Sequence, residues 1–208
     1  MSKNLPRNSE WNRFWLKERQ RSAGAVSWSK RRVLKVLAPY LKKGGCALDA
    51  GCGSGFFSSA FCDAGMEVTA LDYSVEALAM ARAATSGRAR LLQADLLDSA
   101  FPSKAGESFD LIFSDGLFEH FIQTDQDRIL RNLKAVLNPG GVIVTFVPNR
   151  WSPWELIRPF FMPGISETPF VRKTLVDLNR RNGLEVVRYG GVNALPFAFS
   201  PEGPAAGV

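Results

Sequence analysis

The strongest chemical signal in the sequence is a glycine-rich stretch at residues 48–56, LDAGCGSGF. Glycines let the backbone approach a ligand closely and adopt torsion angles that side chains forbid, and a helix that starts after such a turn offers free N–H groups. The pattern predicts a ligand-binding turn between a strand and a helix. A turn with only a structural role is the alternative, because glycine-rich turns also occur without a ligand.

Two carboxylates near this turn narrow the range of ligands that it could bind. The GxGxG spacing lacks the last glycine of the dinucleotide fingerprint, which reads G-x-G-x-x-G. In addition, Asp49 stands two residues before Gly51. A carboxylate there repels a pyrophosphate and attracts the ammonium group of an amino-acid-bearing ligand. Asp72 ends the next apolar run, where a carboxylate can accept both hydroxyls of a ribose. An NAD-dependent oxidoreductase is therefore disfavoured, although such enzymes share the second feature.

Short apolar runs alternate with helical stretches along the chain, which predicts an α/β fold with a parallel sheet covered by helices on both faces. Strands are expected at 46–50, 67–72, 89–95, 109–115 and 141–147. Helices are expected at 29–42, with a kink or end at Pro39, and at 55–64, 74–85 and 124–137. The last of these should stop at the turn formed by residues 138–141, NPGG.

The sequence predicts an N-terminal segment, a main domain with an insertion, and a C-terminal tail. Residues 1–43 form a basic, aromatic helical segment or lid, and residues 44–199 form the main domain. Prolines and aromatics concentrate at 148–170, which predicts a cap insertion, followed by a helix at 171–182, a strand at 184–189 and a further strand at 194–200. The tail at 200–208 is expected to be disordered.

Composition excludes several classes of protein. A chain of 208 residues with 46% hydrophobic residues suits one globular domain, and no apolar run is long enough to span a membrane. The N-terminus lacks the pattern of a secretory signal, so we expect a cytoplasmic protein. The three cysteines form no CxxC pair and His120 is the only histidine, which predicts reduced cysteines and no metal site.

The positive charge is concentrated at one end of the chain. The net charge is +6, yet residues 1–43 hold twelve Lys or Arg against two Glu, and the remainder is net negative. Such a segment suits contact with nucleic acid, an anionic membrane surface or an acidic substrate. A solvated helix face explains it equally well. Nucleic acid is therefore not the favoured partner.

The motifs taken in order resemble those of class I S-adenosylmethionine (SAM)-dependent methyltransferases. LDAGCGSG, ALDYS, QADLLD, FDLIFSDGLFEHF and LKAVLNPGGVIVTFVPN span residues 46–148 and are similar especially to the small-molecule branch described as methyltransferase type 11 or type 12. The resemblance implies SAM as cofactor, S-adenosylhomocysteine as product, and a Rossmann-like, doubly wound, mostly parallel seven-stranded sheet. Its strand order would be 3-2-1-4-5-7-6, with the last strand antiparallel.

The resemblance also implies roles for individual residues around SAM. The turn would pass beneath the methionine part, with Asp49 oriented toward it, and Asp72 would hold the ribose. Tyr73 would lie against the adenine, Asp95 would accept from its amino group, and Leu96 would supply a backbone N–H. Ser114 would offer its carbonyl to the methionine amine. The predicted cofactor-binding residues are thus Asp49, Gly51, Cys52, Gly53, Gly55, Asp72, Tyr73, Asp95, Leu96 and Ser114. Helix-cap, turn or core roles are the alternative for each acid and for Tyr73.

The segment SDGLFEHF should lie beside the transferred methyl group. His120 is the candidate base for a hydroxyl acceptor, because imidazole titrates near neutral pH, and a packing role is the alternative. Related quinone-precursor and RNA-end methyltransferases carry a metal site on E-x-x-E-H here, but Gly116 replaces the first glutamate, so no metal is predicted. The absence of an Asn-Pro-Pro-Tyr-like tetrapeptide lowers the expectation of amino methylation on adenine or glutamine.

Acceptor choice is expected to depend on the two aromatic segments outside the motif core. Together with SDGLFEHF they supply the predicted substrate-pocket residues, namely Trp11, Phe14, Trp15, Asp115, Glu119, Trp151 and Trp154. The two aromatic segments would form a lid over an apolar pocket, make peripheral contact with a membrane surface, or only pack as a cap on the core.

We therefore predict methyl transfer to a small-molecule acceptor, with oxygen slightly favoured as the acceptor atom. An RNA or protein methyltransferase that uses the basic N-terminal arm, and a non-catalytic SAM-binding module, remain alternatives. The sequence predicts no oligomeric state.

Overall fold

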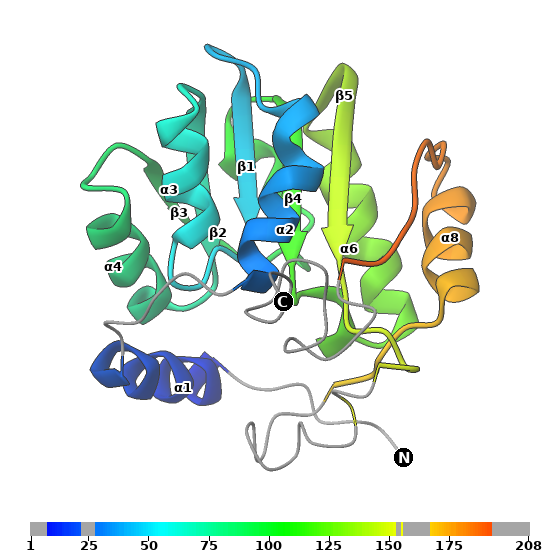
Figure 1. Cartoon of the computed structure of the whole chain (residues 1–208), viewed down its shortest axis with the longest axis horizontal. Coiled ribbons are helices and arrows are strands. Elements are labelled where there is room, and N and C mark those ends of the chain that lie inside the picture. The colour runs from blue at the N-terminus through cyan, green and yellow to red at the C-terminus, as the bar shows by residue number, and fades with distance from the viewer. Residues whose placement is uncertain (1–7, 22–27, 153–154, 156–166, 193–208) are drawn as a thin grey trace, which may run out of the picture.

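The computed structural model describes residues 8–21, 28–152, 155 and 167–192. Five strands, β1 (Cys46–Ala50), β2 (Glu67–Asp72), β3 (Arg90–Gln93), β4 (Phe109–Asp115) and β5 (Leu137–Phe146), form one sheet in the order β3-β2-β1-β4-β5 (Figure 1). Every pair in it is parallel. The chain reverses direction across the sheet between β1 and β4, and open parallel sheets bind ligands at such a point.

Helices cover both faces of the sheet. One face carries α2 (Trp28–Leu37), α3 (Phe56–Asp63) and α4 (Val75–Ala84), and the other carries α5 (Phe101–Ala105), α6 (Gln123–Ala135) and α8 (Arg172–Arg181). The strands are buried on both sides, so neighbouring residues enter different cores: Ala47 packs with α2 and α3, and Leu48 packs with α6. The predicted α/β Rossmann-like class is confirmed.

Helix α1 (Asn8–Arg21) lies apart from these layers, below the carboxyl ends of the strands (Figure 1). It contacts α4, and Ser74 Oγ donates a hydrogen bond to Asn12 Oδ1. Helix α2 instead packs in the core through Val33 and Leu37. It ends before Pro39, where the chain continues as a short 3-10 helix, Ala38–Tyr40, in accord with the expected break.

Strand β5 begins earlier than predicted. Phe109 pairs with Leu137, whereas Leu111 pairs with Val142, so the NPGG residues form an irregularity within the pairing. Gly140 has φ +76° there. The predicted turn therefore exists, but it lies inside β5 because the chain already pairs with β4 at Leu137.

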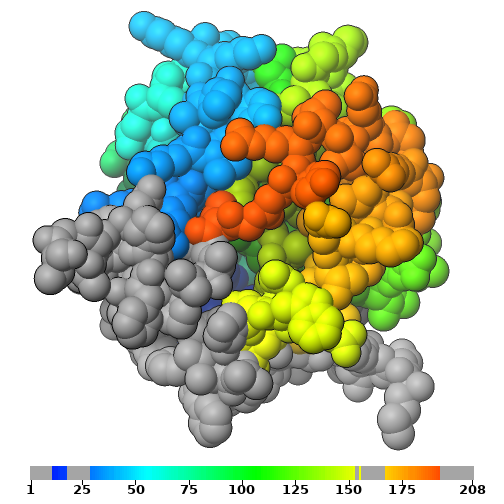
Figure 2. Space-filling view, turned by 45° about the vertical axis from the view of Figure 1, so that its right-hand side comes forward, coloured from blue at the N-terminus to red at the C-terminus, as the bar shows by residue number. Residues whose placement is uncertain are grey.

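The strand predicted at 184–189 does not form. These residues have no strand structure, and Val187 and Tyr189 are exposed. The chain after α8 instead runs back across the molecule toward α2, where Arg32 Nη1 donates to Val192 O at 3.3 Å (Figure 2). The described sheet therefore has five of the seven expected strands. The strand predicted at 194–200, the tail at 200–208 and most of the 148–170 insertion lie outside the described residues.

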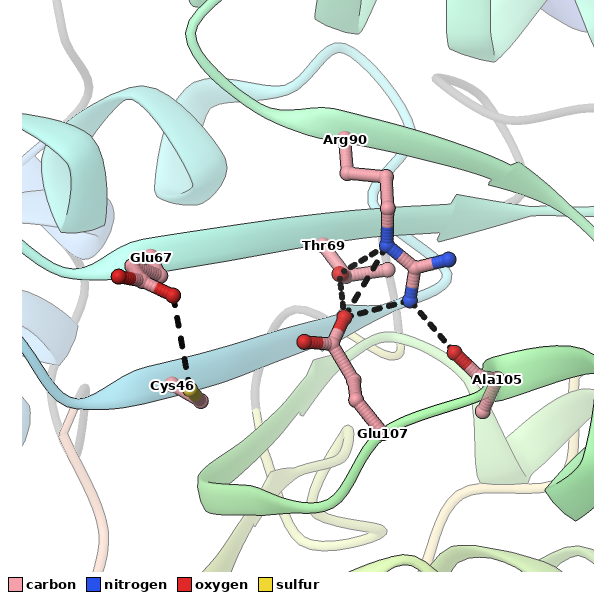
Figure 3. Close-up of polar contacts among 6 residues, drawn as sticks. All are labelled: Cys46, Glu67, Thr69, Arg90, Ala105 and Glu107. Carbon is pink, nitrogen blue, oxygen red and sulfur yellow. Dashed lines mark hydrogen bonds and ion pairs between the residues drawn. The ribbon is translucent and has the colours of Figure 1, made fainter.

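A polar cluster ties β2, β3 and the segment before β4 together (Figure 3). Glu107 Oε1 accepts from Thr69 Oγ1 at 2.8 Å and from Arg90 Nε at 3.0 Å, and Arg90 Nη2 donates to Ala105 O at 2.7 Å. The Arg90–Glu107 pair is partly exposed, so it stabilises the fold only slightly. No helix in the described part of the chain is long and apolar enough to cross a membrane.

Candidate functional site

Main-chain hydrogen bonds to β2 hold the glycine-rich turn after β1. Gly51 N and Cys52 N both donate to Leu71 O, each at 2.8 Å. The glycines at 51, 53 and 55 have φ values of +77°, +50° and +75°, a region that glycine enters with little strain. The predicted turn is present, and it lies at the carboxyl ends of β1 and β2.

Asp72, the last residue of β2, connects this turn to the start of α4. Its Oδ2 accepts from Gly53 N at 3.0 Å and its Oδ1 accepts from Ser74 N at 2.9 Å. Burial raises the pKa of Asp72, and the backbone hydrogen bonds from Ser74 and Gly53 oppose the rise. Each carboxylate oxygen has further lone-pair capacity, so Asp72 can also accept two adjacent hydroxyls of a ligand.

Asp49 is buried beneath the turn. It is 2% exposed, and Ser58 Oγ donates to its Oδ2 at 2.6 Å. Burial raises the pKa of Asp49 to about 7, with the Ser58 hydrogen bonds acting in the opposite direction. A ligand that brings a positive charge next to Asp49 would favour the ionised form, so the site suits a cation.

The residues predicted to surround an adenine lie together at the ends of β2 and β3. Tyr73 is 42% exposed and lies on the same cavity wall as Asp95 and Leu96. Asp95 Oδ1 accepts from Leu97 N at 2.8 Å. Asp95 therefore acts as a turn residue, which was the alternative to its role at the adenine. Its Oδ2 atom takes no part in the bond from Leu97 N.

A cavity of about 820 Å³ opens at the carboxyl ends of the strands, which is within the usual range for ligand pockets, roughly 300 to 1,000 Å³. We call the part next to the ends of β1, β2 and β3 the turn side. It is lined by Asp49, Gly51, Cys52, Gly53, Asp72, Tyr73, Ala94, Asp95, Leu96 and Leu97. We call the part next to the end of β4 the β4 side. It is lined by Trp11, Phe14, Lys30, Phe56, Asp115, Leu117, Glu119, His120, Phe121 and Glu167.

Aromatic side chains of α1 close the cavity from outside. The Trp15 ring lies directly on the turn, since a Cβ atom built on Gly53 would come within 2.6 Å of it. Trp11 packs edge-on against His120, with ring centroids 4.9 Å apart, and Phe14 packs edge-on against both tryptophans. Helix α1 therefore forms a wall shared by both sides of the cavity.

Opposite charges face each other on the β4 side. Asp115 is open to the cavity, yet the surrounding protein desolvates its carboxyl and raises its pKa, and Lys30 opposes this rise. Burial lowers the pKa of Lys30, and Asp115 opposes that shift. The Lys30 ammonium also lies 4.6 Å from the centre of the Phe56 ring. This side combines an apolar, aromatic wall with a small number of ionisable groups.

Glu119 is the most deeply buried carboxyl of the β4 side. It is 3% exposed, and its Oε2 atom has no hydrogen-bond partner. Burial is the largest cause that raises the pKa of Glu119 to about 8, and the charges of Glu167, Asp115 and Glu155 add to it. At neutral pH, without a bound ligand, this carboxyl is therefore mostly protonated.

The structure brings most of the predicted site residues to one cavity but leaves some outside it. Ser114 is buried behind the wall, where its hydroxyl bonds Thr145 Oγ1 at 3.3 Å, and Gly55 packs against Ala81. Trp151 is 79% exposed and does not line the cavity, so the substrate-pocket role predicted for it is not supported by its position. Trp154 lies outside the described residues.

Sequence reasoning missed several lining residues, and Lys30, Glu167 and Phe56 are three of them. Lys30 carries no local signal, because it reaches the cavity through the packing of α2. Glu167 likewise arrives from a distant part of the chain. Phe56 follows the glycine turn directly, and that position at the start of α3 was a signal that could have identified it. Within the described residues, no group of three or more His, Cys, Asp or Glu is arranged to hold a metal ion.

The buried carboxyls predict that the ligand-free protein loses stability as pH rises. Asp49 and Glu119 have pKa values of about 7 and about 8 in the folded state, whereas such groups titrate near pH 4 in an unfolded chain. The folded state therefore binds these protons more tightly, and the resulting stability is complete below about pH 4 and is lost as pH passes through 7 to 8. Each unit of difference corresponds to about 1.4 kcal/mol.

Urea unfolding of the ligand-free protein, followed by circular dichroism at pH 6 and pH 9, measures this loss. We expect a lower midpoint at pH 9. Glu119→Gln should reduce the difference between the two midpoints, and Glu67→Gln, at an exposed position at the start of β2, should leave it unchanged. A midpoint that is constant or rises with pH would show that these carboxyls are not protonated in the folded state.

The comparisons with known proteins agree with this geometry. Residues 48–145 match the family model of a methyltransferase domain. Over 96 residues the chain is 42% identical to a malonyl-[acyl-carrier protein] O-methyltransferase of Enterobacter lignolyticus, covering 46% of this chain and 36% of that one. Over 108 residues it is 31% identical to a ubiquinone biosynthesis O-methyltransferase of Coxiella burnetii, covering 52% and 45%. The chain thus spans less than half the length of these two relatives.

Solved structures share the fold at low sequence identity. A magnesium protoporphyrin IX methyltransferase of Synechocystis with bound S-adenosylhomocysteine superposes with a TM-score of 0.68 at 15% identity, covering 89% of this chain and 91% of that one. A TehB-like SAM-dependent methyltransferase of Corynebacterium glutamicum superposes with a TM-score of 0.60 at 22% identity, covering 86% and 85%. The sheet order, the glycine turn and the matched model lead to one conclusion: residues 48–145 form a methyltransferase domain with the class I SAM-dependent fold, whose cofactor is SAM.

Proposed function

We propose that this protein transfers the methyl group of SAM to a hydroxyl group of a small molecule with an apolar or aromatic body. The observation that carries the proposal is the continuation of the cavity past the turn side into the β4 side, where aromatic rings surround a few ionisable groups. A non-catalytic SAM-binding module would need only the turn side. The named activities of the two relatives, both O-methyltransferases, support oxygen as the acceptor atom.

In this proposal SAM occupies the turn side. Its adenine lies near Tyr73, Asp95 and Leu96, and its ribose hydroxyls bond Asp72. The methionine part passes over the glycine turn, where Asp49 favours its positive charge. This orientation directs the sulfonium methyl toward the β4 side.

Catalysis then depends largely on positioning. The aromatic wall and α1 exclude water and hold the acceptor oxygen in line with the methyl–sulfur bond, and such alignment alone lowers the barrier substantially. Among the described residues the β4 side holds Asp115 and Glu167 beside Glu119, and the carboxylates of Asp115 and Glu167 would repel the phosphates of an RNA acceptor. The position of these acids therefore disfavours the RNA alternative, despite the basic charge of residues 1–43.

The test combines binding and turnover measurements on the full chain. Isothermal titration calorimetry with SAM and S-adenosylhomocysteine should show binding of both. Formation of S-adenosylhomocysteine should then occur with a panel of phenols and catechols, including members that carry an alkyl tail, and not with RNA or peptides. Binding without transfer to any acceptor would support the non-catalytic module instead. Transfer to RNA alone, with strong loss at high salt, would support the nucleic-acid alternative.

A further inference from the structure

The Oε2 atom of Glu119 is fully buried and has no hydrogen-bond partner, and Glu119 is one of the residues that line the ligand cavity. Buried polar atoms in folded proteins are nearly always hydrogen-bonded, and each exception calls for a physical explanation. Leaving such a group unpaired destabilises the fold, so the main packing of the domain does not account for it. An explanation that fits its place is a partner that arrives with the ligand.

The main chain around Glu119 is held firmly. Residues Phe118–His120 form a 3-10 turn directly after β4, and Gln126 Nε2 donates to Phe118 O at 3.0 Å and to Phe121 O at 2.9 Å. Thr168 N donates to Glu119 O at 2.8 Å. The carboxyl is therefore presented from a rigid turn, as a group that acts on a ligand must be.

Gly116 lies next to this carboxyl. It has φ +76°, and a Cβ atom built there would be in ordinary van der Waals contact with Glu119 Oε1, at 3.4 Å. Glu119 therefore lies beside the end of β4, which is where the proposed function places the reacting methyl group.

The charges that face Glu119 determine its strength as a base. Asp115 at the end of β4, together with Glu167 and Glu155, raises the pKa of Glu119 in addition to the effect of burial. His120 is its neighbour in the same turn, and Lys30 lies on the cavity wall on α2. A proton acceptor with a pKa near 8 is well matched to a reaction at near-neutral pH.

His120 is the base that the sequence predicts, but its ring is engaged in packing. It lies edge-on to Trp11 at 4.9 Å, within the row of aromatic rings that α1 places over the cavity. These contacts suit a packing role in the wall of the β4 side. Glu119 differs because one of its oxygens is left without a protein partner.

We propose that Glu119 is the general base of the reaction and that its carboxylate accepts the proton of the acceptor hydroxyl. This inference rests on the proposed function. As the O–H bond breaks, the acceptor oxygen forms a bond to the methyl carbon, and the carbon–sulfur bond breaks with its electron pair remaining on sulfur. The negative carboxylate and the positive sulfonium become a neutral carboxylic acid and neutral S-adenosylhomocysteine. The proton leaves for solvent after the products depart.

The variant Glu119→Gln tests this role, because the amide keeps the shape of the carboxyl and cannot accept the proton. With a phenol or catechol that the wild type methylates, kcat should fall by about 100-fold or more, while the affinity for S-adenosylhomocysteine stays unchanged. The wild-type rate should rise with pH to a plateau, with a midpoint below 8 because the SAM sulfonium favours the ionised carboxylate, and the variant should lose this dependence. Thermal melting checks that the variant is folded.

Three further variants separate the base from a structural role. Glu167→Gln removes a negative neighbour and should move the midpoint of the pH profile to lower pH. His120→Ala should keep the wild-type midpoint, and the control Glu67→Gln should match the wild type throughout. A Glu119→Gln variant with the wild-type rate and pH profile would overturn the base assignment and leave the proposed function intact. No turnover of any phenol or catechol by a wild type that binds SAM would overturn both.

Discussion

Replacing Gly55 with alanine is expected to destabilise the domain by about 2 to 5 kcal/mol. Gly55 precedes α3 with φ +75°, and a left-handed conformation costs a residue with a Cβ atom about 1 to 2 kcal/mol. The new Cβ would also lie 2.4 Å from Ala81 Cα in α4. Because that contact is with backbone, α3 and α4 must move apart, and such overpacking costs about 1 to 3 kcal/mol more. Urea unfolding followed by circular dichroism measures the change.

Gly87→Ala is a matched control for this experiment. Gly87 has a similar φ of +73°, and no heavy atom lies within 4 Å of the position of its added Cβ. The control should therefore show only the conformational cost, about 1 to 2 kcal/mol. Equal losses in the two variants would mean that the close approach of Ala81 contributes nothing. A larger loss in Gly55→Ala, together with weaker SAM binding, is the expected outcome because the same turn lines the cavity.

Replacing Asp72 with alanine is expected to weaken SAM binding by about 1.5 to 3 kcal/mol, which is roughly a 10- to 150-fold increase in Kd. The variant loses the proposed bonds to the ribose hydroxyls. It also loses the bonds from Gly53 N and Ser74 N that hold the turn. Isothermal titration calorimetry with SAM and S-adenosylhomocysteine measures the effect on both ligands.

Two further variants identify the source of that loss. Asp72→Asn keeps one acceptor oxygen and should bind more tightly than the alanine variant. Asp63→Ala removes an exposed carboxylate at the end of α3 that pairs with Arg88, and it should leave affinity unchanged. If Asp72→Ala binds SAM as tightly as the wild type, the ribose is held by other residues.

The core strands could be predicted because their signals are local. Runs such as EVTALD and FDLIFSD are apolar, short and bounded by turns, and parallel strands buried on both faces have this pattern. The run LEVVRY has a similar composition but does not form a strand. A strand requires a partner with free N–H and C=O groups, and sequence composition does not reveal whether the sheet edge offers one at that place.

Much of the site was also predictable, because parallel strands place their carboxyl ends together. Asp49 and Asp72 lie near the ends of β1 and β2, so their proximity follows from strand order alone. The contact of Trp15 with Gly53 and the position of Lys30 do not follow in this way. They depend on how α1 and α2 pack on the sheet, which involves segments distant in sequence.

The sequence by itself determined the α/β class, the glycine turn and the carboxylates that suit SAM, because each depends on residue type and short spacing. Only the tertiary structure favoured Glu119 over His120 as the candidate base. The two are neighbours in the chain, and an isolated imidazole is the better base near neutral pH. Folding buries Glu119 among Asp115, Glu155 and Glu167 and packs His120 against Trp11. Those surroundings come from separate parts of the chain, so no local pattern contains them.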